Sequence, residues 1–105
     1  MNDYATYTRE MHASMQQMMK DMHRDPPSGD PDIDFIAMMI PHHQGAVDMA
    51  RLVIAAGRDP QVRVLAEAIM ASQLSEIEGM RGRLAALRRG GSPDDGFPSP
   101  NGTRG

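Results

Sequence analysis

The chain contains no cysteine and no tryptophan, and only two tyrosines and two phenylalanines among its 105 residues. The lack of cysteine excludes disulfides, thiolate zinc sites and iron–sulfur clusters. The formal net charge of −3, with no basic run beside an apolar helix, argues against nucleic-acid binding and membrane insertion. Zinc-protease, nucleophile-elbow and phosphate-loop motifs are also missing, as is the Glu-x-x-His pair of di-iron bundles. We therefore expect a protein that is not an enzyme.

Signal-peptide features are missing as well. The start, Met1-Asn2-Asp3, has neither the positive charge nor the apolar run of a leader. This start fits a cytosolic protein, and it equally fits a mature domain whose leader has been removed. The ligand chemistry described below favours the second alternative, a periplasmic or secreted protein.

What the sequence does contain is an all-α pattern. Apolar periodicity predicts helices over residues 3–24, 31–57 and 60–89, in a domain of residues 1–89, followed by a flexible Gly/Pro/Ser-rich tail of residues 90–105. Asn2 or Asp3 is the expected cap of the first helix, and the Asp-Pro pairs 30–31 and 59–60 open the other two. Gly57 is expected to end the second helix in a left-handed conformation. Pro41, inside that helix, predicts a kink.

The short connection between the second and third helices predicts that they are antiparallel neighbours. We expect a three-helix up-down bundle. Because three helices leave a bundle incomplete, we also expect a homodimer that completes the core through Met-rich surface.

Methionine is the most unusual component, with eleven Met and four His in the chain. Residues 8–24 hold five of these Met and two of the His, but no Leu, Ile, Val or Phe. A Met stripe is often only an adaptable core filler. Thioether sulfur and imidazole nitrogen are also the ligands that Cu(I) prefers, and a thioether neither deprotonates nor forms disulfides. The absence of Leu, Ile and Val from this helix indicates that its methionines are present for their sulfur.

The second helix carries two Met–His pairs at i,i+4 spacing, Met38–His42 and Met39–His43. We expect His42 to be a ligand at the heart of the bundle. The alternative is a neutral core histidine that is hydrogen-bonded to Gln73 or Glu76 on the third helix.

A second, more exposed site is expected on the first helix, around His12, Met19 and His23. The full set of predicted ligands is Met11, His12, Met15, Met19, Met22, His23, Met38, Met39, His42, His43, Met49 and Met80. The side chains expected to orient these ligands by hydrogen bonds are Asp34, Gln73 and Glu76.

Two blocks of the sequence resemble the domain-of-unknown-function family 305. They are DFIAMMIPHHQGAVDMARLV at 34–53, with the family's M-x-P-H-H-x-x-A core, and DPQVRVLAEAIMASQLSEIEGM at 59–80, with its Q-x-x-E-I-x-x-M. The resemblance covers about residues 8–84. Family members commonly have an aromatic residue after the last Met, where this chain has Arg81-Gly82-Arg83.

This resemblance implies a ferritin-like helical bundle, often secreted, some members of which are periplasmic copper-binding proteins linked to copper tolerance. The site residues it implies are Met38, Met39, His42, His43, Gln73, Glu76 and Met80. We therefore expect binding of copper, with Cu(I) favoured and Ag(I) or Zn(II) as alternatives, for extracytoplasmic sequestration, tolerance or delivery. A copper donor or acceptor protein would then be a partner. The competing hypothesis is a Met-rich peptide-binding or dimerisation module without a metal.

Overall fold

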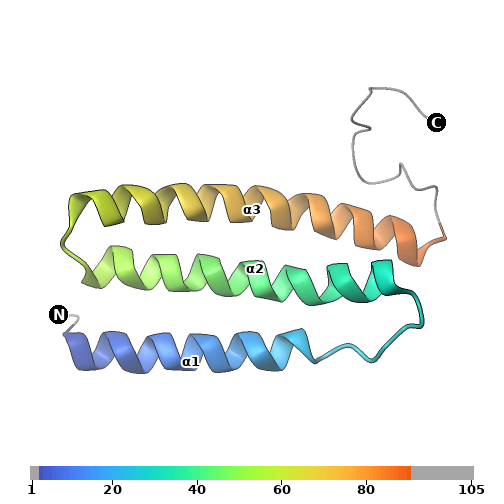
Figure 1. Cartoon of the computed structure of the whole chain (residues 1–105), viewed down its shortest axis with the longest axis horizontal. Helices are drawn as coiled ribbons and strands as arrows, with labels where there is room; N and C mark the ends of the chain where they lie inside the picture. Colours follow the sequence, from blue (N-terminus) through green and yellow to red (C-terminus); the bar gives the residue numbers. More distant parts are fainter. Residues whose placement is uncertain (1–2, 91–105) are drawn as a thin grey trace.

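The computed structural model describes residues 3–90, and within that range all regular secondary structure is helical. The helices are α1 (Tyr4–Met22), α2 (Pro31–Ala56) and α3 (Pro60–Arg88), in up-down order (Figure 1). These bounds confirm the three predicted helices closely. The predicted tail, residues 90–105, lies outside the described residues apart from Gly90.

All three helices begin at an aspartate cap. In each, the side-chain oxygen of Asp3, Asp30 or Asp59 accepts a hydrogen bond, 2.7 to 2.9 Å long, from a backbone N–H two or three residues further on. Such a bond satisfies one of the N–H groups that a helix start leaves without a partner. Pro31 and Pro60 occupy the first helical position of α2 and α3, where the missing N–H is not needed.

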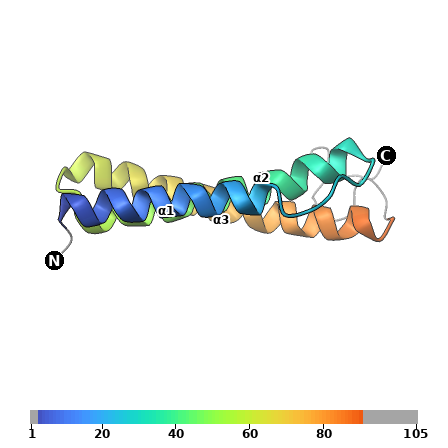
Figure 2. The same cartoon turned by 90° about the horizontal axis from the view of Figure 1, so that it is seen from below.

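The helices lie side by side in one flat layer, with α2 in the middle (Figures 1 and 2). α2 packs against both neighbours, while no Cα atoms of α1 and α3 lie within 8 Å of each other. The Cα atoms span only 15 Å along the shortest axis. The all-α, up-down arrangement is therefore as predicted, but the three helices do not close around a common core.

Most of the described core lies between α2 and α3. Val47 and Ala50 of α2 and Ala66, Ile77 and Leu84 of α3 are buried. By contrast, α1 has no fully buried residue. The apolar contribution to stability therefore comes mainly from the α2–α3 pair.

Glycine brings α1 and α2 close together. A methyl group on Gly45 of α2 would overlap Sδ of Met18 on α1, and would lie 2.9 Å from its Cγ. A side chain at this position would therefore require Met18 to move. α2 itself continues through the buried Pro41, from Pro31 to Ala56.

The expected left-handed cap at Gly57 is wrong, since its φ is −80° and its ψ is 167°, an extended conformation. The chain must turn at once into the cap of α3, so it leaves α2 extended. Glycine is needed here for another reason, because a Cβ at this position would lie 2.7 Å from the carbonyl oxygen of Val53.

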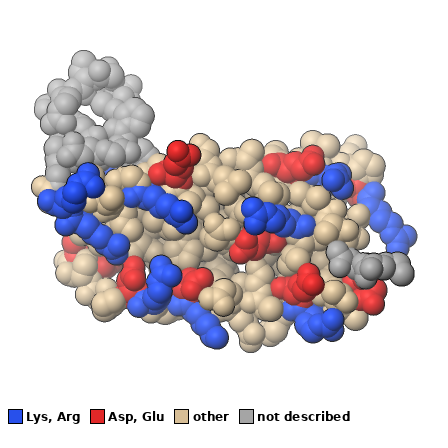
Figure 3. Space-filling view, turned by 180° about the vertical axis from the view of Figure 1, so that it is seen from behind, with Lys and Arg blue, Asp and Glu red and all other residues tan. Residues whose placement is uncertain are grey.

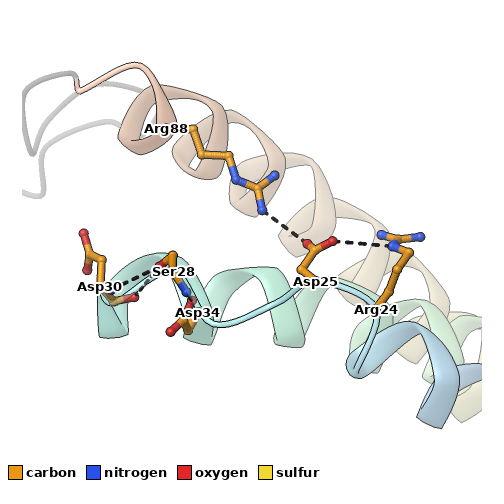
Figure 4. A network of polar contacts seen from close by, with 6 residues as sticks. All are labelled: Arg24, Asp25, Ser28, Asp30, Asp34 and Arg88. Atoms are coloured by element: carbon orange, nitrogen blue, oxygen red, sulfur yellow. Dashed lines mark hydrogen bonds and ion pairs between the residues drawn. The ribbon is translucent and has the colours of Figure 1, made fainter.

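The connection between α1 and α2 is fastened at both ends (Figure 4). Asp25 accepts from Nη2 of Arg88, the last residue of α3, at 3.2 Å. Ser28 donates its backbone N–H to Asp34 at 2.9 Å. The exposed ion pair adds little stability, but it does tie the end of α3 to the connection that precedes α2. None of the described helices is long and apolar enough to span a membrane.

Candidate metal-binding face

Two contacts fix how α2 is turned within the layer. Gly45 faces Met18 of α1, and His43 reaches Glu76 of α3. At about 100° per residue, His42 points between these two sides, out of one broad face of the layer. His42 is exposed there. The expectation that it lies at the heart of the bundle is therefore wrong, because a single layer leaves this side of α2 uncovered.

His43, the next residue, takes the position expected for its neighbour. Its Nε2 lies 2.8 Å from Oε1 of Glu76, and its side chain is only 13% exposed. A carboxylate oxygen accepts hydrogen bonds, so Nε2 carries the hydrogen. Nδ1 of His43 is buried and has no hydrogen-bond partner. The predicted role of Glu76 as a histidine partner is met, but the histidine is His43.

Ser72 belongs to this arrangement although sequence reasoning missed it. Its hydroxyl donates to Oε2 of Glu76 at 3.3 Å, so that both carboxylate oxygens are engaged. The i,i+4 spacing of Ser72 and Glu76 on α3 was the available signal. Gln73, the other expected partner, is half-buried on the same helix.

The face around His42 is rich in thioethers. Met38 lies one turn before His42 and is 38% exposed, while Met49 is half-buried two turns after it. On antiparallel α1, Met18 points to α2, so Met15 and Met19 turn to the same face as His42. Their exposed fractions are 47% and 51%.

From α3, apolar side chains extend the same face. We call it the Met/His face and define it by Met15, Met19, Phe35, Met38, His42, Met49, Val62, Leu65 and Ile69. The opposite face has a different character: Lys, Arg, Asp and Glu side chains are spread across it (Figure 3). It includes the ion pairs Asp48–Arg51 and Arg63–Glu67.

The remaining predicted ligands divide by position. Met11 and Met22 are half-buried on the side of α1 that faces α2, and Met39 and Met80 are half-buried on α2 and α3. None of these four is as exposed as Met15, Met19 or Met38.

The second site predicted on α1 is too long to be a single metal site. His12 and His23 are eleven residues apart, which is about 16 Å along a helix, so they cannot hold one ion. Instead, i,i+3 and i,i+4 spacings join His12 to Met15, Met15 to Met19, and Met19 to His23. The result is a ladder of exposed soft ligands along one side of α1.

His23 ends this ladder in a defined orientation. It caps α1, and its Nδ1 lies 2.8 Å from the carbonyl oxygen of Met19. Because a carbonyl oxygen only accepts, Nδ1 carries the hydrogen, which leaves the lone pair of neutral Nε2 free toward a metal.

Carboxylates contribute little to a metal site in the described range. Within residues 3–90, no three side chains of the His, Asp and Glu types come together as a metal-holding group. Asp34, expected to support the Met38–His42 pair, accepts instead from the Ser28 backbone. A metal on this face would therefore be held mainly by thioethers and single imidazoles, which favours a soft ion.

The chain matches the model of a known protein family. The model of the family described as Domain of unknown function (DUF305) matches residues 1–84 and, in an overlapping match, residues 32–101. The chain therefore belongs to this family, as the M-x-P-H-H-x-x-A block indicated. No curated protein matches the sequence.

Proposed function

We propose that this member of the DUF305 family binds Cu(I) on its Met/His face and takes no part in catalysis. One observation carries the proposal: the exposed imidazole of His42 shares a face with the exposed thioethers of Met15, Met19 and Met38. Thioether sulfur binds Cu(I) and Ag(I) well but competes poorly for hard cations such as Mg²⁺. Zn(II) would find too few nitrogen and oxygen ligands here.

The ligands have different roles in this proposal. His42 supplies the strongest donor, and Met38, one helical turn before it, reaches toward the same point. Met15 and Met19 add thioethers from α1, while the Met19–His23 pair provides a second, weaker position. Met11, Met22, Met39, Met49 and Met80 supply the surrounding sulfur, which the ion meets after local rearrangement.

The setting follows from the donor chemistry. A protein that binds Cu(I) without a thiolate keeps its ligands under oxidising conditions, because a thioether forms no disulfide. We therefore propose that the chain acts outside the cytoplasm, in sequestration or tolerance of copper, or in its delivery to an acceptor protein. Handover to an acceptor protein would require the ligands on this face to be uncovered.

The test is an anaerobic Cu(I) titration in competition with a chromogenic chelator. We expect wild-type protein to compete, and His42→Ala and Met38→Leu each to weaken binding at least about tenfold, or about 1.4 kcal/mol. Met70→Leu is the matched control, because Met70 is a half-buried thioether on the opposite face, beside Arg51 and Leu74. If neither His42→Ala nor Met38→Leu changes the affinity, the assignment of this site is wrong.

The exposed apolar side chains support a second candidate function. Phe35 and Leu65 are 58% and 60% exposed on the same face, which suits a peptide-binding or dimerisation module. Leucine retains apolar bulk but lacks sulfur. A triple variant in which Leu replaces Met15, Met19 and Met38 would thus preserve protein binding and abolish Cu(I) binding, which separates the two functions.

A further inference from the structure

On the Met/His face, exposed apolar side chains gather that no other described helix covers. Met15, Met19, Phe35, Val62 and Leu65 are each between 45% and 60% exposed on it. Monomeric proteins rarely leave contiguous apolar patches larger than about a few hundred Å² in water, so exposed apolar side chains gathered on one face point to a binding surface.

We propose that a second copy of this chain covers the Met/His face, and that the two copies share one copper site at their twofold axis. This proposal rests on the proposed function. The first argument is exposure, because apolar side chains that are about half exposed on one face are covered when a second, identical face stacks on it. The second is shape, since a layer only 15 Å thick forms a two-layered core when a second layer stacks on it.

Charge supports the same occupant. The ion pairs Asp48–Arg51 and Arg63–Glu67 lie on the opposite face, so they stay in water when two copies stack. The carboxylate of Glu76, near the middle of α3, is already bonded to His43 and Ser72. Two identical faces therefore meet without strong like-charge repulsion, which a self-complementary twofold contact requires.

The position of α2 determines what meets at the axis. α2 is the central helix, so stacking two layers in register places it over its own counterpart. His42 lies close to the middle of Pro31–Ala56. Its position in the stacked pair is therefore similar whether the twofold axis runs along the helices or across them. In both cases the two His42 side chains come together near the axis, each with its Met38.

The shared site follows from these positions. α2 of one protomer offers a single exposed imidazole, that of His42, whereas two protomers offer two imidazoles and two thioethers from His42 and Met38. Four soft donors complete the coordination of one Cu(I) ion, and the buried surroundings would exclude water and oxidants. The tightest site is therefore expected to hold one ion per two chains.

Sedimentation equilibrium of the full chain, with and without Cu(I), tests whether the Met/His face forms the dimer contact. Leu65→Glu places a charge on it without removing a ligand, and Val64→Glu is the matched control. The two residues are neighbours on α3 with similar exposure, 60% and 65%, but Val64 points away from the Met/His face. We expect wild type and Val64→Glu to have twice the chain mass of 11.5 kDa. Leu65→Glu should weaken the dimer at least about tenfold, with unchanged helix content by circular dichroism.

Crosslinking tests the axis directly, because the chain has no cysteine of its own. Ala46→Cys lies one turn after His42 on the same face, and Ala55→Cys lies on the opposite side of α2. Oxidation should link Ala46→Cys into covalent dimers and leave Ala55→Cys monomeric. Equal crosslinking of both variants would place the axis elsewhere and overturn the proposal.

The outcomes separate this inference from the proposed function. A wild-type monomer that still binds Cu(I) tightly would overturn the shared site and keep copper binding. A dimer that Leu65→Glu disrupts, but that binds no Cu(I), would overturn copper binding and leave only the face contact. One ion per chain at the tightest site would overturn sharing, whereas one ion per dimer, lost in His42→Ala, supports it.

Discussion

Nε2 of His43 and Oε1 of Glu76 lie 2.8 Å apart and join the middle of α2 to the middle of α3. The two side chains differ in environment, since that of His43 is 13% exposed and that of Glu76 is 54% exposed. The contact fixes the rotation of α2, and it thereby decides that the adjacent His42 points out of the layer. A pairing within the protein thus positions the residue that we assign to the metal.

Removing this carboxylate should cost stability without removing a ligand. In Glu76→Ala, the N–H of a largely buried imidazole loses its acceptor, and we expect the free energy of unfolding to fall by about 1 kcal/mol. Glu76→Gln keeps an acceptor oxygen, so its free energy of unfolding should fall less. Urea unfolding monitored by circular dichroism measures both, with Glu78→Ala, an exposed site on the same helix, as control. A loss as large in Glu78→Ala would argue against a specific role for the pair.

The first cap predicts an acid-sensitive helix. Hydrogen bonding from the Thr6 backbone, and then from its side chain, lowers the pKa of Asp3 from its ordinary value of 3.8. A carboxyl group whose pKa is lower in the folded state stabilises that state above pH 3.8, and this contribution is lost as the pH falls through the lowered pKa.

NMR titration of the Asp3 carboxyl, alongside amide exchange in the first turn of α1, would measure this dependence. Asp3→Asn keeps a capping oxygen but has no charge to titrate. In this variant, amide exchange in the first turn of α1 should therefore lose the part of its pH dependence that Asp3 causes. An Asp3 titration at or above the ordinary value would contradict the prediction.

The close approach of α1 and α2 gives a packing prediction. Alanine is favoured over glycine inside a helix by about 1 kcal/mol, but the methyl of Gly45→Ala would overlap Met18. We expect the overlap to dominate and to cost about 1–3 kcal/mol. Met18→Ala should relieve it, so the double variant should be more stable than the sum of the single effects implies. A double-mutant cycle by thermal or urea unfolding checks this, and additive effects would mean that the two residues do not meet.

Oxidation should distinguish the methionines by position. Met15 and Met19 are about half exposed, whereas Met11, Met18 and Met22 are half-buried against α2. In the Leu65→Glu variant, whose Met/His face is uncovered, dilute peroxide should therefore convert the first two to sulfoxides earlier. Peptide mass spectrometry follows each site. Ag(I), which mimics Cu(I) without its redox chemistry, should protect Met15 and Met19 if they bind the metal. Equal oxidation rates with and without Ag(I) would remove these two thioethers from the site.

The sequence predicts the helices well, because residues next to each helix end determine where it begins or stops. Asp30-Pro31 and Asp59-Pro60 are strong start signals, and each one opens a helix at the expected residue. The short connection after Gly57 forces antiparallel neighbours, as found. The conformation of Gly57 was missed because it depends on how quickly the next helix must begin.

The candidate site was predicted in composition but not in arrangement. A helical pattern fixes the angle between His42 and His43, but it does not say which of them meets a neighbouring helix. That choice depends on two contacts, of Gly45 with Met18 on one side of α2 and of His43 with Glu76 on the other. Sequence alone therefore indicated the Met–His chemistry, and only the layer shows that His42 is accessible.

The flat arrangement has a further consequence for motion. α1 packs only on α2 and buries none of its own residues completely, so lifting it away leaves the α2–α3 core intact. Such local opening requires less free energy than global unfolding. Amide hydrogens of α1 should therefore exchange sooner than those in the middle of α3. The helix that carries more methionines than either of the other two is thus the part of the fold best able to come loose, which would expose Met11, Met18 and Met22 to a passing ion.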